Sequence, residues 1–388
     1  MSEYRMIHSF AKEVKRKNSG NQSQADVYSV TKHDGFVRSL DYFKRQVFSR
    51  DLSTYKVVKK GEFAYSTIHL EEGALGLLED MEALISPMYT VFQVDESIDE
   101  IYLSHVLISS ELINKYGLIS QGSVNRRKSL PFSSFAELEV FTPPLPEQKK
   151  IAEILSGIDQ LIITLEQNIN AKLELFSDLL QDHFSSVTKN DNFTLGDILA
   201  KPIQYGANAS AIKLTPGSPR YIRITDINED GTLCDEGAVG ISLNSEEYAD
   251  YYLNNGDLLL ARSGNTIGKS YLHINSRNDL IFAGYLLRIS INAAIYKPDY
   301  LFLFTQSEIY KRWVSESSRT GAQPNINAKE YASMLIPSIS VCQQEEFIDA
   351  AMSIRNCSAL AKGKIKKLKI LKQAIAADLL SGRKRVSV

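Results

Sequence analysis

Residues 263–270 (SGNTIGKS) come closest to a catalytic motif, because two glycines precede a lysine and a serine. A phosphate-binding P-loop has four residues between its glycines, whereas Gly264 and Gly268 enclose three. The motif also needs a helix whose N-terminus faces the phosphate, but residues 271–274 are predicted to continue as a strand. We therefore reject a nucleotide-hydrolysing site at this position.

No other stretch has the spacing of a catalytic or metal site. Residues 142–145 (TPPL) lack the asparagine that would hold a target amine and the aromatic residue that would stack a flipped base, so they are not an amino-methyltransferase site. The six histidines form no metal pattern, and Cys234, Cys342 and Cys357 lack the spacing of zinc ligands. No glycine-rich nucleotide fingerprint is present. We predict that this chain has no catalytic residue, metal or cofactor of its own.

The side chains that remain are of the types that contact nucleic acids. Residues 256–265 are predicted to form a strand that carries Arg262 into a polar loop, and residues 321–327 form a second loop rich in amides. Arginine can bind guanine through two hydrogen bonds, asparagine and glutamine can bind adenine in the same way, and lysine binds phosphate. The candidate DNA contacts in this half of the chain are Arg223, Arg262, Ser263, Asn265, Thr266, Lys269, Arg319, Gln323, Asn325 and Asn327.

The first half of the chain offers fewer candidates of this kind. Lys59 and Lys60 lie in a predicted turn, and Arg126, Arg127 and Lys128 lie in a predicted loop. Taken alone, each of these loops is more often an ordinary surface turn. Two such loops in each half of a duplicated chain favour a binding surface.

Overall charge does not identify a nucleic-acid-binding protein, because 44 basic and 46 acidic residues leave a net charge of −2. Locally, residues 1–60 contain 13 Lys and Arg against 6 Asp and Glu, and residues 362–385 contain nine basic residues and one acidic residue. Residues 61–105 contain ten acidic residues and no Lys or Arg. The acidic stretch is either a solvated face or a face turned away from a polyanion; the basic helix is either solvated or contacts nucleic acid or an acidic partner.

With 388 residues, the chain is long enough for two or three globular units. It begins without an apolar signal segment and has no uncharged apolar run of eighteen residues, so we expect neither export nor a membrane span. The odd number of cysteines suggests no disulfide framework and fits a reducing compartment. We therefore expect a cytoplasmic protein.

Two long helices are predicted from apolar residues that recur in steps of four and three, which is typical of a coiled coil. An amphipathic core helix is the alternative, but core helices usually have about 8–20 residues. Three prolines at positions 143, 144 and 146 fix the start of the first helix. The first seam comprises Ile151, Leu155, Ile158, Ile162, Leu165, Ile169, Lys172, Phe176 and Leu179. The second, weaker seam comprises Phe347, Ala351, Ile354, Ser358, Ala361, Ile365, Leu368, Lys372, Ile375 and Leu379.

The two halves of the chain resemble each other. Residues 59–63 match residues 254–258 as a turn that feeds a strand, and residues 147, 148 and 151 match residues 343, 344 and 347 at a constant distance of 196. Strand signals at residues 55–58, 63–67 and 89–94 and a helix at residues 99–116 predict an α+β fold. If the second helix returns toward the first domain, the helices pair as an antiparallel coiled coil and the chain has pseudo-two-fold symmetry. The predicted boundaries are 1–142 and 188–338 for the domains, and 143–187 and 339–388 for the helices.

Taken together, these features resemble the specificity subunit of type I restriction-modification enzymes along essentially the whole chain. The resemblance rests on residues 144–155 (PLPEQKKIAEIL), 221–227 (YIRITDI), 256–264 (GDLLLARSG), 323–327 (QPNIN) and 378–382 (DLLSG). It implies two target-recognition domains, each of which reads one half of a bipartite target on double-stranded DNA.

The resemblance also implies partners. Two methyltransferase subunits would bind the paired helices, and restriction subunits that supply motor and nuclease would join that core. S-adenosylmethionine, Mg and ATP would then belong to the partner subunits. The residues expected to contact the partners are Leu145, Glu147, Gln148, Ile151, Ile154 and Phe347.

The first half departs from this family pattern. It lacks an opening strand and turn like residues 193–197, and residues 122–127 (GSVNRR) replace the Gln-Pro-Asn loop. Residues 338–344 (SISVCQQ) replace the proline-rich start of the first helix, so the two partner surfaces need not be equivalent. Two other functions stay open: a coiled-coil spacer that holds two protein-interaction domains without reading DNA, and a self-sufficient methyltransferase or nuclease, against which the missing motifs count.

Overall fold

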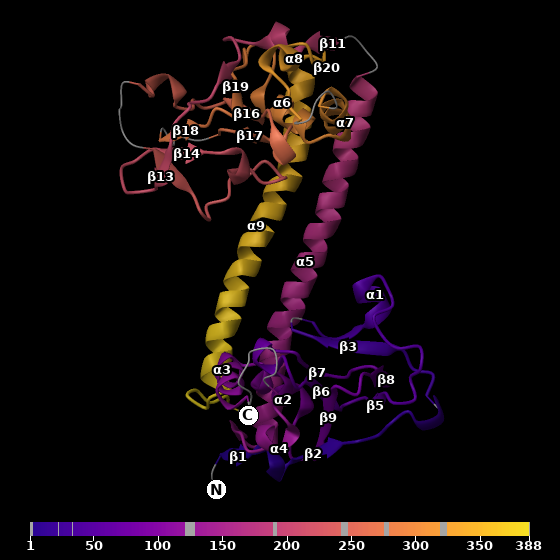
Figure 1. The fold of residues 1–388 in the computed structure, drawn as a ribbon. Coiled ribbons are helices and arrows are strands. Elements are labelled where there is room, and N and C mark those ends of the chain that lie inside the picture. The colour runs from indigo at the N-terminus through magenta and orange to yellow at the C-terminus, as the bar shows by residue number, and fades with distance from the viewer. Residues whose placement is uncertain are drawn as a thin grey trace. The chain divides into compact units, whose positions relative to one another are not determined.

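The computed structural model describes residues 3–21, 23–32, 34–120, 129–188, 192–241, 247–274, 279–318 and 324–387. The chain divides into two compact units. The first unit is Met1–Leu165 together with Gly363–Val388, and the second unit is Glu166–Lys362. Each unit therefore contains a globular part and a segment of each of the two longest helices, α5 (Leu145–Val187) and α9 (Val341–Leu379) (Figure 1).

In the part of the first unit that the structure describes, two four-stranded sheets and four short α-helices form most of the globular part. One sheet has the order β2-β9-β6-β7 and is antiparallel; the other has the order β4-β3-β8-β5 and pairs β3 with β8 in parallel. Strand β1 (Tyr4–Met6) pairs with β10 (Glu139–Phe141) just before α5 begins. The remaining elements are β2 (Ala11–Val14), β3 (Val27–Thr31), β4 (Gly35–Arg38), α1 (Ser39–Phe43), β5 (Lys56–Lys59), β6 (Phe63–Ser66), β7 (Leu75–Leu77), β8 (Glu82–Ile85), β9 (Tyr89–Val94), α2 (Glu100–Leu107), α3 (Ser110–Ile119) and α4 (Phe132–Phe135).

The second unit repeats this plan, which confirms the predicted duplication. The sheet β12-β19-β16-β17 corresponds to β2-β9-β6-β7, and β15-β14-β18, with β14 and β18 parallel, corresponds to β4-β3-β8. Among the described residues, strand β13 extends the sheet at the β15 edge, whereas the first unit extends its sheet at the opposite edge with β5. The elements are β11 (Asn192–Thr194), β12 (Gln204–Tyr205), β13 (Ala211–Lys213), β14 (Arg220–Ile222), β15 (Val239–Ile241), β16 (Leu258–Ala261), β17 (Ser270–Leu272), β18 (Leu280–Phe282), β19 (Leu286–Ile289), α6 (Pro298–Thr305), α7 (Glu308–Ser317), α8 (Ala328–Ala332) and β20 (Leu335–Pro337).

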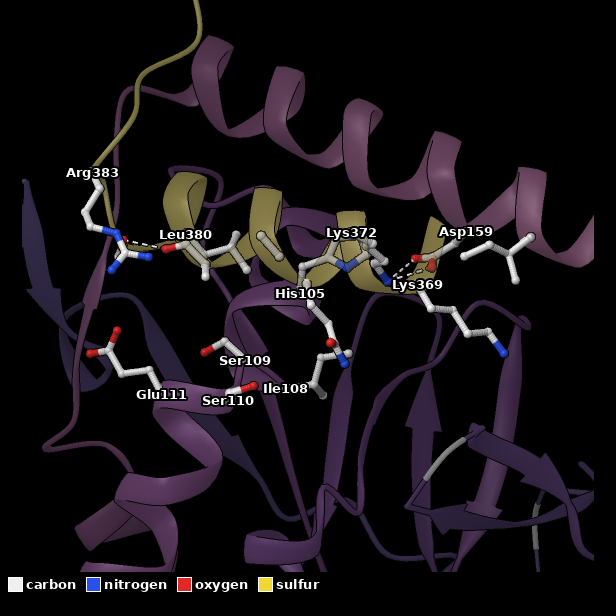
Figure 2. A pocket seen from close by; sticks show the side chains of 15 residues that line it. His105, Ile108, Ser109, Ser110, Glu111, Asp159, Lys369, Lys372, Leu380 and Arg383 are labelled. Carbon is white, nitrogen blue, oxygen red and sulfur yellow. Dashed lines mark hydrogen bonds and ion pairs between the residues drawn. The ribbon is translucent and has the colours of Figure 1, made fainter. Parts of the chain in front are cut away.

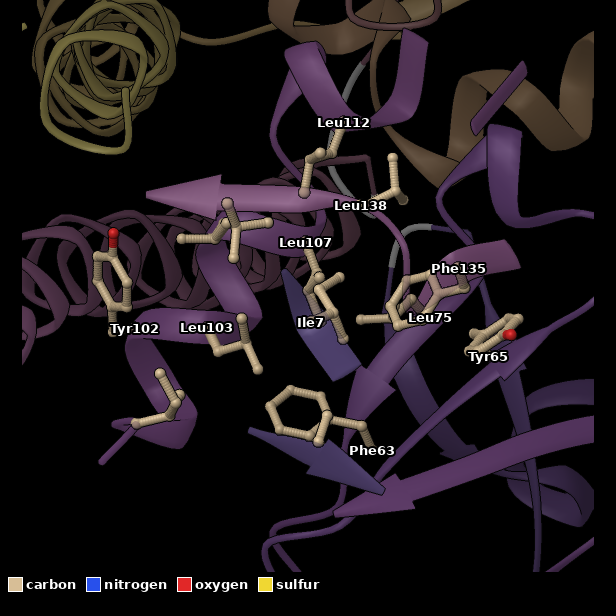
Figure 3. Close-up of a cluster of buried hydrophobic side chains, with 14 of the residues drawn as sticks. Ile7, Phe63, Tyr65, Leu75, Tyr102, Leu103, Leu107, Leu112, Phe135 and Leu138 are labelled. Atoms are coloured by element: carbon tan, nitrogen blue, oxygen red, sulfur yellow. The ribbon is translucent and has the colours of Figure 1, made fainter. Parts of the chain in front are cut away.

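Apolar side chains from both sheets and helices fill the core of each unit. Figure 3 shows part of the first core, where Tyr65 of β6 lies beside Phe135 and Phe63 of β6 lies toward Leu103 of α2. The start of α5 and the end of α9 join this core through Ile151, Ala152, Leu155, Leu379 and Leu380. In the second unit, Leu180 and Phe184 of α5 and Phe347 and Ala351 of α9 join the core in the same way.

The long helices confirm the predicted seams. Every position of both seams is buried or half-buried, including Lys172, Ser358 and Lys372, which break the apolar pattern. The first unit holds the start of α5 and the end of α9, and the second unit holds the end of α5 and the start of α9, so within each unit the helices run antiparallel. Lys372 is accommodated because its Nζ lies 2.6 Å from both carboxylate oxygens of Asp159 on α5.

Two expectations about the first half are wrong. Residues 99–116 form two helices instead of one, because the Ser109 side chain accepts a hydrogen bond from the Leu112 amide and caps a new helix. The missing opening strand is present as β1, followed by a 3-10 helix (Ile7–Ser9), and it pairs with β10 as β11 pairs with β20. Residues 4–6 pair along one edge only and are largely exposed, so their sequence shows no alternation of buried apolar residues.

The predicted domain boundaries stay a prediction. In the part of the chain that the structure describes, no helix has the length and apolar character needed to cross a membrane.

Candidate nucleic-acid interface

The loop that follows β16 presents the predicted DNA contacts of the second unit. All four residues of β16 are buried, and Arg262 is the first residue after the strand. The chain turns through a 3-10 helix (Gly264–Thr266) and returns as β17, and the turn is closed by hydrogen bonds from Gly268 N to Ala261 O (2.9 Å) and from Ala261 N to Lys269 O (2.8 Å). A side chain at Gly268 would meet Val314 at 2.8 Å and would face a positive φ of 84°. These contacts fasten the two ends of the loop to each other and favour glycine at position 268.

A second segment is fastened to this loop by its backbone. The Ile326 amide donates to Arg262 O at 2.9 Å, and Ser263 forms a β-bridge with Asn325. Ile326 is fully buried, whereas Asn265 and Asn325 are exposed. The structure thus brings together Arg262, Ser263, Asn265 and Asn325, although about sixty residues separate the two segments.

Two aromatic residues beside Arg262 were missed in the sequence. The Arg262 guanidinium carbon lies 4.8 Å from the centroid of the Tyr205 ring, and the Arg262 amide donates to Tyr285 O at 3.1 Å. The Tyr205 and Tyr285 side chains are 41% and 63% exposed. Stacking on Tyr205 orients the guanidinium without using its N–H groups, and the Arg262 Nε has no hydrogen-bond partner among the described residues. Arginine held in this way can bind a base edge or a phosphate with two hydrogen bonds.

Other candidates of the second unit already have internal partners. Arg223 donates from Nε and Nη2 to the buried Asp226 carboxylate at 3.2 and 2.8 Å, and these hydrogen bonds raise the pKa of Arg223. Lys269 Nζ lies 2.9 Å from the Glu229 carboxylate. The Asn327 side chain accepts from two backbone amides and caps α8. These three side chains stabilise the loops, and their internal partners already use part of the hydrogen-bonding capacity that contact with DNA would need.

Thr266 lies in the same loop, and its hydroxyl is buried without a hydrogen-bond partner in the described part of the chain. Arg319 and Gln323 lie outside the described residues.

In the first unit, the counterpart of Arg262 is Thr67. The Leu130 amide donates to Thr67 O at 2.8 Å, as the Ile326 amide donates to Arg262 O. Matching residues 59–63 with residues 254–258 already places Thr67 opposite Arg262, so the sequence contained this signal. Lys59 and Lys60 are exposed at the turn between β5 and β6, and Arg126, Arg127 and Lys128 lie outside the described residues.

The residues predicted to contact partner proteins lie mostly inside the two units. Ile151 and Phe347 belong to the cores, Ile154 packs against the first core, and Leu145 is half-buried. The side chains of Glu147 and Gln148 are buried and hydrogen-bonded within the first unit. This burial does not fit a docking surface made of these six residues.

Glu147 forms an ion pair and hydrogen bonds with the C-terminal segment at Arg385 and Val386, and we call this set of contacts the clasp. Arg385 donates from Nε and Nη2 to the two Glu147 oxygens at 2.8 and 2.6 Å, and the Val386 amide adds a hydrogen bond of 3.2 Å. Arg385 also donates from Nη1 to Glu3 at 2.8 Å. The hydrogen bonds from Arg385 hold the pKa of the Glu147 carboxyl below its usual value of 4.5.

Acidification is expected to weaken this clasp. Because the folded pKa of Glu147 is lowered, its contribution to stability is full above pH 4.5 and is lost as the pH falls through the folded pKa. Glu147→Gln should therefore lower the unfolding temperature at pH 7, and the difference from the wild type should shrink as the pH falls toward about 3. Thermal unfolding at pH 7, 5 and 3.5 measures this, with the exposed Glu153→Gln as control. A difference that does not change with pH would contradict the role of the charged clasp.

A cavity of about 580 Å³ in the first unit lies where α2 and α3 meet the long helices (Figure 2). Its charged lining groups are largely engaged: Lys372 pairs with Asp159, Glu111 with Lys115, and Arg383 with Asp378. Burial lowers the pKa of His105 in its wall to about 4, so this imidazole is neutral near pH 7. No group of three or more His, Cys, Asp or Glu residues in the described ranges could hold a metal ion.

Comparisons with known proteins find similarity to specificity subunits of type I restriction enzymes. A model of the type I restriction modification DNA specificity domain matches residues 80–175. Over 322 residues, the chain is 24% identical to the type I restriction enzyme MjaVIII specificity subunit of Methanocaldococcus jannaschii. This alignment covers 78% of this chain and 74% of that protein. Over 164 residues, it is 29% identical to the putative type I restriction enzyme MjaX specificity subunit of the same organism, covering 41% of this chain and 37% of that protein.

Two solved structures share the fold. The S subunit of the type I restriction-modification system from M. genitalium matches with a TM-score of 0.60 and 14% identity, over 97% of this chain and 95% of that chain. A chain from a study of complex assembly and conformational transition of the type I R-M system matches with a TM-score of 0.53 and 13% identity, over 98% of each chain.

Proposed function

From the relationship of this chain to the specificity subunits of type I restriction enzymes, we propose that it is the non-catalytic subunit that recognises the DNA target of such an enzyme. Each globular domain recognises one half of a bipartite DNA sequence, and α5 and α9 connect the two domains. The observation that carries the proposal is the pairing of the loop after β16 with the segment at Asn325 and Ile326, which brings Arg262, Asn265 and Asn325 together.

The chemistry of this loop suits the major groove. Arg262 offers a planar set of donors that matches the two acceptors of guanine, and exposed asparagines can bind adenine through one donor and one acceptor. Tyr205 holds the guanidinium in place, which reduces the conformational freedom that binding must remove. Lys59 and Lys60 in the first unit are exposed and suited to phosphate contacts.

Genomic methylation provides the test of this function. We expect N6-methyladenine to occur in a bipartite motif with an unread spacer, and to disappear from that motif when the gene is deleted. Restoration by the wild-type gene controls for secondary effects. If no motif is lost, and the chain also shows no salt-dependent binding to duplex DNA, the chain is a spacer between protein-interaction domains instead.

Catalysis then belongs to partner subunits. We propose that two methyltransferase subunits bind the long helices, that restriction subunits join this core, and that S-adenosylmethionine, Mg and ATP are bound by the partners. The complex would act in the cytoplasm, where genomic DNA is accessible.

The surface for these partners is better sought at exposed apolar residues of the long helices, because such residues are costly to leave in water. In the first unit they are Leu161, Ile163, Ile370 and Leu371, and in the second unit they are Leu173, Leu175 and Leu360. We propose that each group contributes to the docking of one methyltransferase subunit.

Introducing charge at one group should remove one partner. Ile370→Asp with Leu371→Asp, and separately Leu173→Asp with Leu175→Asp, should each give a complex that retains one methyltransferase subunit, because a buried unpaired carboxylate is strongly unfavourable. Native mass spectrometry of the co-purified complex measures the stoichiometry. Lys366→Ala with Lys367→Ala, on the same helix, serves as control. Retention of two methyltransferase subunits by both aspartate variants would refute the assignment.

A further inference from the structure

Two glutamines make the same set of hydrogen bonds in the two units. The Gln148 Oε1 accepts from the Asp99 amide at 2.9 Å, and its Nε2 donates to Pro143 O at 2.8 Å and Ser97 O at 3.1 Å. The corresponding partners of Gln344 are Lys297 N (2.7 Å), Ile339 O (3.1 Å) and Ile295 O (3.4 Å). The internal duplication has thus kept three contacts, not only a residue type.

Both side chains are sealed from water, with exposures of 2% for Gln148 and 0% for Gln344. The side chain faces one backbone N–H group and two backbone carbonyl groups. A glutamine matches them, because its neutral amide has a carbonyl oxygen that accepts from the N–H group and an NH₂ group that donates to both carbonyls. A glutamate would lose the donors, and an apolar side chain would remove all three hydrogen bonds and leave the backbone groups that face it without this partner. The position therefore needs glutamine specifically.

The hydrogen bonds connect two structural parts in each unit. Asp99 and Lys297 are the N-cap residues of α2 and α6, which belong to the globular domains. Gln148 and Gln344 lie in the first turns of α5 and α9. Each glutamine therefore ties a domain helix, and the segment before it, to the start of the long helix of the same unit.

We propose that Gln148 and Gln344 are positioning residues that fix the orientation of each recognition domain on its long helix, and thereby fix the length of the unread DNA spacer. The proposal rests on the proposed function, because it concerns how far apart the two half-sites are read. Neither glutamine reads a base. Hydrogen bonds are directional, so losing three of them between a domain and its long helix allows the orientation of the domain relative to the helix to vary.

The preference of the complex for one spacer length over others distinguishes a positioning role of these glutamines from a role in stability alone. The wild-type chain, assembled with its methyltransferase partners, is assayed on duplexes that keep both half-sites and vary the spacer by up to two base pairs in either direction. We expect Gln148→Met and Gln344→Met each to lower the preference for the natural spacer over its nearest neighbours by about fivefold or more, as the loss of an ordinary hydrogen bond would. The preferred bases within each half-site should stay the same.

Gln343→Met is the matched control. Gln343 is the neighbour of Gln344, and its Oε1 accepts from Ser340 N and Ser340 Oγ at the start of α9, but its side chain is exposed. The same substitution there removes a helix cap without touching the domain, so spacer preference should be unchanged even if the unfolding temperature falls. Hydrogen exchange on the purified chain should show faster exchange of the Asp99 amide in Gln148→Met and of the Lys297 amide in Gln344→Met.

Each outcome bears on the proposal. Broader spacer use by both glutamine variants, with the control unchanged, supports it. Unchanged spacer preference in assembled complexes, equal loss of methylation at every spacer, or failure of the variants to assemble would each overturn it, because a merely structural role predicts those results. A wild-type complex that methylates none of the duplexes would instead refute the proposed function.

Discussion

Replacing Arg262 by alanine is expected to weaken binding of the natural target by about 1–3 kcal/mol and to relax base selection at one position of one half-site. The guanidinium rests on the Tyr205 ring and its Nε is buried, while the residue as a whole is only half-buried, so we expect the terminal N–H groups to be the ones that meet a base edge. The loop itself should survive, because it is held by the backbone hydrogen bonds to Ile326 and Lys269. Binding to a library of duplexes randomised in both half-sites measures the effect.

Arg262→Lys is the matched variant that separates base reading from phosphate binding. Lysine keeps the positive charge but loses the planar pair of donors. If Arg262 reads a base, both variants should lose selectivity at the same position, while the other half-site stays unaffected. If Arg262 binds phosphate, Arg262→Lys should be nearly normal and Arg262→Ala should weaken all sequences alike, with a smaller salt dependence. That second pattern would remove Arg262 from the base-reading residues.

The sequence was sufficient for the parts of the fold that depend on periodicity. The four-three spacing gave both seams, and the lysines that interrupt it are half-buried as the pattern requires. The matched turns were also predictable: Gly61 and Gly256 have φ values of 84° and 88°, a conformation that favours glycine and leaves a recognisable residue before each strand.

The interior role of Glu147 and Gln148 could not be predicted in the same way. Glutamate and glutamine are usually exposed, so at the start of a helix they indicate a surface. Here both are buried with partners that are mostly distant in sequence, Arg385 for Glu147 and the segment at Ser97 and Asp99 for Gln148. Long-range pairing of this kind has no local signal, and the same is true of Tyr205, which meets Arg262 from another strand of the sheet.

Lengthening both long helices is expected to lengthen the unread spacer. Each helix continues without interruption from one unit into the other, so residues inserted into it add helical rise between them. Four residues inserted after Asn168 and four near Ala361 add about 6 Å. DNA advances about 3.4 Å per base pair, so the spacer should grow by one or two base pairs while both half-sites keep their sequences.

The size of the insertion matters because the helices pack through a defined seam. Four residues turn a helix by little more than one full turn, so Ile169 and Ile365 keep facing the seam in which they are buried. Two residues turn it by only about half a turn, which would rotate these side chains out of the seam and prevent assembly. Mapping of methylated motifs in cells that carry each variant measures the spacer directly. With the four-residue insertion, full activity on the original spacer would show that the long helices do not set the distance between the half-sites.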